Sequence, residues 1–152
     1  MRALIQRAQR AQVTVDGEVI GRIGAGLVVL LGVGQEDTPA DVKLLAEKTV
    51  NLRIFTDDQD KLNLSALDRQ LPLLIVSQFT LYADCRKGRR PSFSDAAPPE
   101  LGEALYEMFC AEVEKTGLQV AKGRFRSYMQ VELVNDGPVT IWLDTKTLRG
   151  GF

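Results

Sequence analysis

The segment Leu27–Leu31, with the sequence LVVLL, decides the fold class of this chain because it leaves neither face of a strand polar. The turn-forming run Gly24-Ala25-Gly26 directly precedes it. Continuous apolar runs of this length are typical of strands covered on both faces, whereas half-buried strands alternate apolar and polar residues. The sequence therefore predicts that residues 27–31 form a strand buried on both faces.

The chain before this strand is also predicted to be β-structure. Residues 3–8, 11–15 and 18–23 are short segments rich in valine and isoleucine. Asp16-Gly17 lies between the last two, and an Asp-Gly pair in that position is a strong signal for a two-residue hairpin. We therefore expect a hairpin at residues 11–23.

Two helices are predicted after the apolar strand. The first begins at Thr38-Pro39-Ala40-Asp41, where a hydroxyl cap is followed by a proline and an acidic residue in the first turn. The second begins at Pro98-Pro99-Glu100 and ends near Gly117. Further strands are predicted at residues 52–55, 71–81, 118–121, 127–134 and 139–143, with a polar loop at 82–98. A sheet-rich pattern with two helices covering one side predicts an α+β fold.

Composition limits the chemistry that this chain can perform. Its 152 residues, 45% hydrophobic and 26% charged, are typical of one globular domain, which we predict over residues 1–152. The absence of histidine excludes Ser-His-Asp and Cys-His triads and histidine-based zinc sites. Cys85 and Cys110 lack the CxxC spacing of a zinc or redox site. We therefore expect no metal and no cofactor, and a chemistry based on carboxylates, backbone dipoles, hydroxyls or groups of the substrate.

The same features predict a soluble, cytoplasmic protein. Two cysteines in unrelated contexts are typical of a reduced intracellular chain. The N-terminus does not resemble a signal peptide, and the longest apolar stretch, Leu27–Val33, is far shorter than a membrane span. We expect no association with a membrane.

Basic residues are clustered although the net charge is only −1. One cluster follows the predicted strand at 71–81 and the other precedes the strand at 127–134. They consist of Arg86, Lys87, Arg89 and Arg90, and of Lys122, Arg124 and Arg126. Each cluster is either a solvated surface or a contact for phosphates, and charge alone favours the solvated surface.

The first segment that could carry chemistry is Ser77-Gln78-Phe79-Thr80-Leu81. Two hydroxyls, an amide and an aromatic ring end a strand that is otherwise apolar. Alternation along the strand places residues 77, 79 and 81 on one face and residues 78 and 80 on the other. Such a strand end can offer backbone N–H groups to an oxyanion and a ring to a base or sugar. The alternative is a strand that simply becomes polar as it reaches the surface.

The second segment is Asn135–Thr140, with the sequence NDGPVT. Asn-Asp-Gly between two strands is first of all a turn. The proline after the glycine is less usual, because X–Pro bonds are the ones that adopt the cis form, and cis proline serves a specified geometry. The glycine carbonyl is also open to close approach by a ligand.

These two segments resemble the signature motifs of the D-aminoacyl-tRNA deacylases, also called D-tyrosyl-tRNA deacylases. The resemblance covers essentially the whole chain, including residues 3–7, the Asp16-Gly17 turn and Arg90-Pro91-Ser92-Phe93. It implies a homodimer of compact, β-rich, barrel-like subunits with two active sites at the subunit interface. It also implies hydrolysis of D-aminoacyl-tRNA, and of mischarged glycyl-tRNA, as proofreading in translation quality control.

The resemblance further implies roles for individual residues. A cis Gly137-Pro138 would reach into the partner's pocket, where its two carbonyls would accept hydrogen bonds from the α-ammonium group and exclude L side chains. Arg7 would hold this dipeptide. The backbone N–H groups of Phe79 and Thr80 would stabilise the oxyanion. The substrate would also contact Ser77, Gln78 and Met129. Once the substrate is a tRNA, phosphate contacts by Arg86, Lys87, Arg89 and Arg90 are as well supported as a solvated surface.

The attacking group and two competing functions are left open by the sequence. The absence of histidine favours water assisted by the 2′-hydroxyl of the terminal ribose over Thr80 as a covalent nucleophile, since Thr80 would need a nearby base. A non-enzymatic RNA-binding module would explain the basic clusters and Phe79, but not the glycine-proline turn. An esterase for a free small molecule would use the same oxyanion site without tRNA.

Overall fold

The computed structural model describes residues 1–150 of the chain, so the predicted domain of residues 1–152 extends two residues beyond the described part. The strands are β1 (Arg2–Val15), β2 (Glu18–Ile23), β3 (Gly26–Gly32), β4 (Phe55–Thr56), β5 (Leu62–Leu64), β6 (Leu73–Ser77), β7 (Val120–Lys122) and β8 (Gln130–Asp144). The helices are α1 (Pro39–Asn51), α2 (Ala66–Arg69), α3 (Pro99–Glu114) and α4 (Thr145–Arg149), with the 3₁₀ turn η1 at Phe79–Tyr82.

The long strand β1 organises the main sheet, because three other strands pair with it. Its first half pairs with β3, its second half with β2, and β8 runs antiparallel to it along its other edge. The turn from β1 to β2 is the predicted hairpin. Asp16 and Gly17 both have positive φ, 50° and 79°, as a two-residue turn of this hand requires.

The strand predicted at residues 27–31 is confirmed, and all of these residues except Leu30, which is only partly buried, are buried. β3 pairs with β1 on one side and, in the parallel sense, with β6 on the other. Leu27, Val29 and Leu31 belong to the core beneath the helices, whereas Val28 belongs to a second apolar cluster inside the curl of the sheet. A strand with two apolar surroundings needs apolar residues at consecutive positions, which is why this run does not alternate.

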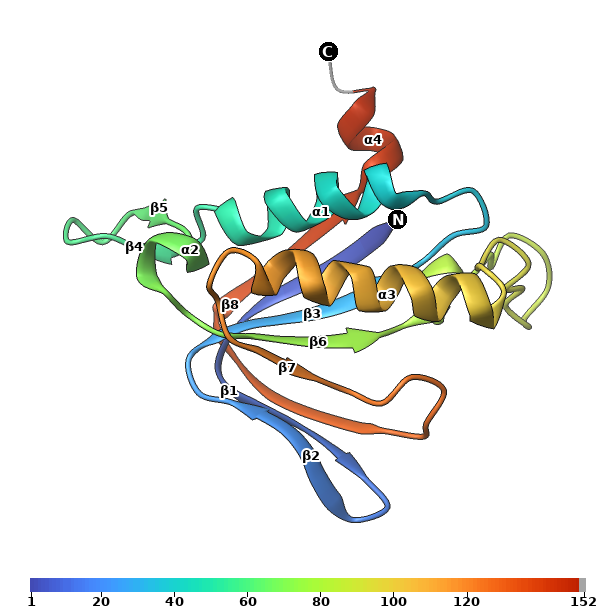
Figure 1. The fold of residues 1–152 in the computed structure, drawn as a ribbon, viewed down its shortest axis with the longest axis horizontal. Coiled ribbons are helices and arrows are strands. Elements are labelled where there is room, and N and C mark those ends of the chain that lie inside the picture. The colour runs from blue at the N-terminus through green and yellow to red at the C-terminus, as the bar shows by residue number, and fades with distance from the viewer. Residues whose placement is uncertain (151–152) are drawn as a thin grey trace.

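The helices α1 and α3 lie side by side over one face of the sheet (Figure 1), as the sequence predicts. Thr38 caps α1 with Asp41, whose carboxylate accepts the Thr38 N–H at 2.9 Å, and Pro39 occupies the first turn. The short helices α2 and α4 were not predicted, because four or five residues carry too little periodic signal. No helix formed by residues 1–150 is both long and apolar enough to cross a membrane.

The sheet curls until it is nearly closed, which gives the α+β, barrel-like fold. The two end strands of the order, β2 and β7, approach each other, and the lower half of Figure 1 shows the sheet curving away from the helices. A Cβ at Gly21 would lie 2.7 Å from the Lys122 carbonyl oxygen, so the two strands can approach this closely only because Gly21 has no side chain.

Four sequence-based assignments are wrong in detail. The strand predicted at residues 52–55 is only Phe55–Thr56. Residues 3–8 and 11–15 form one strand rather than two. Residues 127–134 and 139–143 are not two strands joined by a turn, because Gln130–Asp144 runs along β1 without reversing direction. The strand predicted to reach Leu81 ends at Ser77, where the chain enters η1, so side chains beyond residue 77 do not alternate between faces.

Candidate active site

An open pocket of about 680 Å³ lies where β6 ends. Its walls are formed by the end of β6, by the loop before α3, and by the segment between β7 and β8. The lining residues are Val76, Ser77, Gln78, Phe79, Phe93, Ala96, Ala97, Pro99, Phe125, Arg126, Ser127, Tyr128, Met129 and Val131. Four of the predicted site residues therefore meet here: Ser77, Gln78, Phe79 and Met129.

The turn η1 begins at the pocket-lining residue Phe79 and has two adjacent backbone N–H groups at its start, those of Phe79 and Thr80, although Thr80 itself does not line the pocket. The first hydrogen bond of the turn runs from the Leu81 N–H to the Gln78 carbonyl at 3.3 Å. The N–H groups of Phe79 and Thr80, one and two residues earlier, therefore have no carbonyl within the turn to bond to. Two such N–H groups beside an aromatic wall can stabilise negative charge on a substrate oxygen.

Phe79 forms part of this wall, although 56% of its surface is exposed. Its ring meets the edge of the Phe93 ring, with 5.1 Å between centroids and 75° between planes. This contact joins η1 to the loop before α3. The Thr80 side chain is exposed, and its hydroxyl oxygen accepts a hydrogen bond from the Gln78 amide.

The opposite wall is held by contacts to the end of β6. The Ile75 carbonyl accepts from the buried Tyr106 hydroxyl of α3 at 2.6 Å and from the Gly123 N–H at 3.3 Å. Burial raises the pKa of Tyr106 well above its usual value, so the hydroxyl remains a donor. The Met129 sulfur accepts from the Arg124 N–H at 3.3 Å and would lie 2.7 Å from a Cβ at Gly123. The segment 123–129 is thus fixed against β6 at one end and closed by Met129 at the other.

The Gly137–Pro138 bond is cis and lies in a bulge of β8. Gln6 pairs with Thr140 and Ala8 pairs with Asn135, so residues 136–139 all stand opposite the single residue Arg7. The Asn135 side chain closes the bulge: its oxygen accepts from the Val139 N–H at 2.8 Å, and its amide donates to the Thr140 hydroxyl at 3.0 Å.

Arg7 holds this bulge against the rest of the subunit. Its Nε donates to the Asp136 carbonyl at 2.8 Å, and its Nη1 donates to the Ile54 carbonyl at 2.8 Å. Its side chain is only 13% exposed. Gly137 has φ of 140°, and a Cβ there would lie 3.1 Å from Arg7 Nη2. The arginine and the glycine therefore pack directly on each other.

Within residues 1–150, the bulge and the pocket do not meet. Strand register aligns Ser77 with Ala3 through Leu31, whereas the bulge is aligned with Arg7. The two lie four residues apart along the strands and three strands apart across the sheet. Along the surface of the sheet these offsets amount to roughly 13 Å and 14 Å, and none of residues 135–140 lines the pocket. Arg7, Gly137 and Pro138 are thus grouped with one another but not with Ser77, Phe79 and Met129.

The predicted phosphate-binding residues lie in the loop between η1 and α3. Asp84 and Ser92 pair through two backbone hydrogen bonds of 2.7 and 2.9 Å, which close the base of the loop. Lys87, Arg89 and Arg90 are exposed at its tip. Arg86 differs, because it donates to both carboxylate oxygens of Asp84 at 2.9 and 2.7 Å. These hydrogen bonds lower the pKa of Asp84 to about 2.

Several residues of the site carried no clear signal in the sequence. Phe93, Phe125 and Tyr128 enter the pocket from loops, where no periodicity indicates which side chains point inward. Asn135 and Ile54 support the bulge. Of these two, only Asn135 could have been assigned a supporting role from the sequence, because it lies beside Gly137-Pro138. No group of three or more acidic or cysteine side chains within residues 1–150 is arranged to hold a metal ion.

Comparison with known sequences identifies relatives over nearly the whole chain. The sequence model of the D-Tyr-tRNA(Tyr) deacylase family matches residues 4–144. A D-aminoacyl-tRNA deacylase of Roseiflexus castenholzii is 61% identical over 149 residues, which cover 98% of this chain and 95% of the relative. A D-aminoacyl-tRNA deacylase of Fervidobacterium nodosum is 59% identical over 146 residues, which cover 96% of this chain and 98% of the relative.

Solved structures share the fold. A protein described as c-Myc DNA Unwinding Element Binding Protein is 44% identical, with a TM-score of 0.89 over 95% of this chain and 98% of that one. A probable eukaryotic D-amino acid tRNA deacylase is 20% identical, with a TM-score of 0.82 over 93% of this chain and 97% of that one, which shows a common fold. On the family match and the two close relatives, this chain belongs to the D-Tyr-tRNA(Tyr) deacylase family.

Proposed function

We propose that this chain hydrolyses the ester bond of D-aminoacyl-tRNA, and of mischarged glycyl-tRNA, in the cytoplasm. The products are tRNA and the free amino acid, so the reaction removes D-amino acids before they reach the ribosome. Membership of the family and the names of the relatives support this function. The observation that carries it is the aromatic pocket at the end of β6, which brings Ser77, Gln78, Phe79 and Met129 together at the start of η1. Residues 1–152 act as one domain in this proposal.

The reaction requires little from the protein because the substrate is an activated ester. Water, helped by the 2′-hydroxyl of the terminal ribose, forms a bond to the carbonyl carbon, and the carbonyl oxygen becomes an oxyanion. The two N–H groups of η1 stabilise this charge. The bond to the ribose oxygen then breaks as the oxyanion collapses to the carboxyl group, and the ribose oxygen takes up the proton that the attacking water lost, passed on by the neighbouring 2′-hydroxyl. This scheme needs no histidine, which the chain does not contain.

We propose that the working form is a homodimer whose active sites lie at the interface. In one chain Gly137-Pro138 does not line the pocket, so a second copy supplies the dipeptide if both act on one substrate. The face of the sheet away from the helices offers a surface for this contact. Trp142 pairs across the strands with Leu4, and Leu4 with Leu30, and 49% of the Trp142 surface is exposed.

Exclusion of L-amino acids follows from the same arrangement. The carbonyls of Gly137 and Pro138 hold the α-ammonium group, so an L side chain points into the dipeptide backbone and a D side chain points away from it. Rejection by a clash does not depend on what the D side chain is. Glycine has no side chain to exclude, so glycyl-tRNA is also accepted.

The decisive assay is hydrolysis of D-Tyr-tRNA beside L-Tyr-tRNA by the purified protein in the presence of a chelator. We expect rapid loss of the D ester alone. Equal cleavage of both esters would indicate a general esterase, and binding of tRNA without cleavage would indicate an RNA-binding module. Deacylation within about tenfold of wild type by Thr80→Ala would exclude Thr80 as a covalent nucleophile, whose removal costs far more.

The shared site can be tested by complementation. Ser77→Leu fills the pocket and Gly137→Leu blocks the dipeptide, so each variant alone should be inactive. Random exchange of subunits makes half of the dimers mixed, and each mixed dimer has one intact site, so about a quarter of wild-type activity should return on mixing. An unchanged lack of activity after exchange, with mixed dimers verified by mass spectrometry, would refute the shared site.

A further inference from the structure

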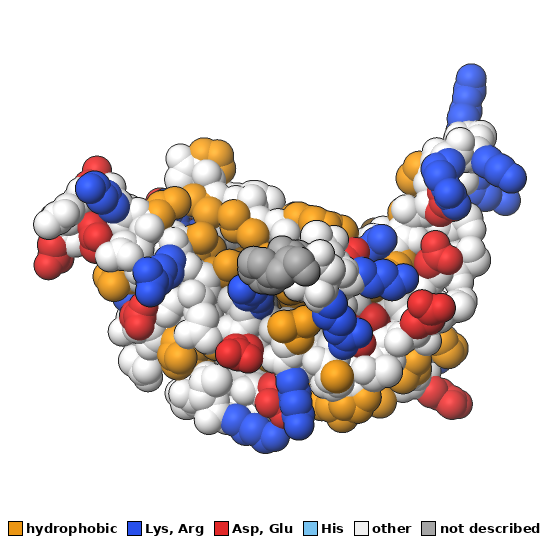
Figure 2. All heavy atoms as spheres, turned by 90° about the horizontal axis from the view of Figure 1, so that it is seen from above, with side chains coloured by type: hydrophobic (Ala, Val, Ile, Leu, Met, Phe, Trp, Pro, Cys, Tyr) orange, Lys and Arg blue, Asp and Glu red, His pale blue; other side chains and the backbone are white. Residues whose placement is uncertain are grey.

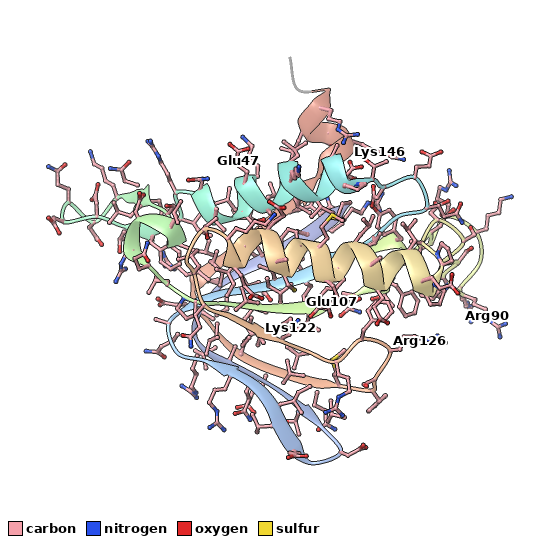
Figure 3. All side chains as sticks on the ribbon, in the orientation of Figure 1. Glu47, Arg90, Glu107, Lys122, Arg126 and Lys146 are labelled. Atoms are coloured by element: carbon pink, nitrogen blue, oxygen red, sulfur yellow. The ribbon has the colours of Figure 1, made fainter. Side chains whose placement is uncertain are left out.

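The rim of the pocket has two basic sides and one acidic side. The first basic side is the loop before α3, whose base lines the pocket through Phe93 and whose exposed tip carries Lys87, Arg89 and Arg90. The second is formed by Arg124 and Arg126, in the segment between β7 and β8. Arg126 lines the pocket itself. Figure 3 shows Arg90 and Arg126 at the same end of the molecule, and Figure 2 shows basic side chains on the projection at that end.

Both basic sides are fixed relative to the pocket. The first loop is closed at its base by the Asp84–Ser92 pair, and Phe93 beside it packs on Phe79. In the second segment, the Ser127 N–H donates to the Arg124 carbonyl at 3.2 Å, and Arg126 has a φ of 63°. A non-glycine residue in this left-handed conformation is uncommon, and it is maintained by the surrounding contacts. The positive charges are therefore held at the opening rather than on free tails.

These five charges are available to a ligand, in contrast to their basic neighbours. Arg86 is bound to Asp84, and Lys122 Nζ lies 2.8 Å from Glu107 Oε2. Within the part of the chain that the structure describes, Lys87, Arg89, Arg90, Arg124 and Arg126 take part in no ion pair.

The third side of the opening is acidic. A hollow of about 440 Å³ continues from Arg126 along the exposed face of α3 and is lined by Glu100, Glu103 and Glu107. Glu107 is compensated by Lys122, whereas Glu100 and Glu103 take part in no ion pair among the described residues. These two carboxylates, three residues apart on one helix, repel a phosphate chain. A nucleic acid that enters the pocket can therefore leave it between the two basic sides but not along α3.

We propose that the single-stranded 3′ end of the tRNA crosses the rim between these two basic sides, with Arg124 and Arg126 on one flank and Lys87, Arg89 and Arg90 on the other, and that the acidic face of α3 excludes it from the third side. This route rests on the proposed function, since it starts from a terminal adenosine in the pocket. It assigns phosphate contacts to Arg124 and Arg126, and it assigns none to Arg86 because the charge of that residue is already compensated by Asp84.

The test compares two substrates that share the pocket but differ in phosphates. The first is D-Tyr-tRNA, and the second is the D-tyrosyl ester of adenosine, which has none. The variants are Arg124→Gln with Arg126→Gln, and Arg89→Gln with Arg90→Gln. The matched control removes two exposed charges of α1, on the other side of the helical layer, through Lys43→Gln with Lys48→Gln.

For D-Tyr-tRNA, each double variant should lower kcat/KM by roughly tenfold for every arginine–phosphate hydrogen bond removed, the effect of deleting one charge-assisted hydrogen bond. The slope of log Kd against log salt should fall by about 1.4, because each phosphate contact to a single strand contributes about 0.7. The adenosine ester should be cleaved at the wild-type rate by Arg89→Gln with Arg90→Gln. With Arg124→Gln and Arg126→Gln it should lose less activity than D-Tyr-tRNA does, because Arg126 also lines the pocket. The control variant should behave as wild type with both substrates. The single variant Arg126→Lys should keep most of the wild-type kcat/KM for D-Tyr-tRNA because it keeps the positive charge.

Each failure has a distinct meaning. If the wild-type protein cleaves neither ester, the proposed function fails and the route fails with it. If it cleaves D-Tyr-tRNA but the double variants keep the wild-type kcat/KM and salt slope, only the route is refuted. Equal losses with both substrates would show that the arginines build the pocket and would also refute the route. A rise of about tenfold or more in kcat/KM for Glu103→Lys at 150 mM salt, where the charges are screened beyond about 8 Å, would place the phosphates over α3 instead.

Discussion

Replacement of Arg7 by alanine tests whether this side chain fixes the Gly137-Pro138 bulge. Arg7 donates one hydrogen bond to the Asp136 carbonyl and one to the Ile54 carbonyl, each 2.8 Å long, and its side chain is 13% exposed. Hydrogen bonds from a charged group contribute about 1.5–3 kcal/mol each. Because Asp136 lies at the surface, where water can replace the donor, we take the lower end of this range. Arg7→Ala should therefore lower the free energy of unfolding by about 3 kcal/mol.

Urea denaturation provides the measurement, with the midpoint expected to fall and the m-value to stay constant. Arg7→Lys is the matched variant: it keeps the charge but lacks the forked guanidinium, so it can reach only one of the two carbonyls. It should lose about half as much stability, about 1.5 kcal/mol. A domain of ordinary stability remains folded after either change, so activity can be measured at 25 °C.

Deacylation should report the loosened bulge separately from stability. Under conditions where both variants are folded, kcat/KM for D-Tyr-tRNA should fall in the order wild type, Arg7→Lys, Arg7→Ala. The L ester should begin to be cleaved by Arg7→Ala, because a mobile dipeptide no longer excludes the L side chain. A loss of less than about 0.5 kcal/mol for Arg7→Ala, the usual effect of a neutral surface substitution, would refute the holding role.

Three further changes have defined outcomes. Gly137→Ala should lower the free energy of unfolding by about 1–3 kcal/mol in urea, because alanine at φ 140° is strained and its Cβ would lie within 3.1 Å of three neighbouring atoms; an unchanged midpoint would contradict this. Tyr106→Phe removes the 2.6 Å hydrogen bond to the buried Ile75 carbonyl and should cost about 1–2 kcal/mol by the same measurement, whereas a stable variant would show that Gly123 alone satisfies that carbonyl. Burial raises the pKa of the Cys110 thiol to about 12, so Ellman's reagent at pH 8 should modify Cys85 in the native protein and both thiols in urea; rapid reaction of two thiols in the native protein would show that α3 opens.

The local sequence determined the elements whose signals are complete within a few residues. Asp16-Gly17 specifies its turn because both residues tolerate positive φ, and Leu27–Leu31 specifies a doubly covered strand because no polar face is available. Thr38-Pro39 specifies the start of α1 through capping and the fixed φ of proline. The motif of residues 77–81 and that of residues 135–140 could also be singled out from sequence, although the roles of their residues remain predictions.

Only the tertiary structure decided how these pieces are placed. Gln130–Asp144 stays one strand across the Gly137-Pro138 bulge because β1 binds it on both sides of Arg7, and no local pattern reports a partner more than a hundred residues away. Likewise, η1 replaces the predicted strand end at Phe79, since β3 ends at Gly32 and gives β6 no further partner beyond Ser77. The separation of Gly137 from Ser77, and the meeting of Arg126 with Phe93 at one rim, follow from register and sheet curvature. Long-range pairing fixes these positions, because hydrogen bonding between strands depends on the partner that is present and not on the strand's own sequence.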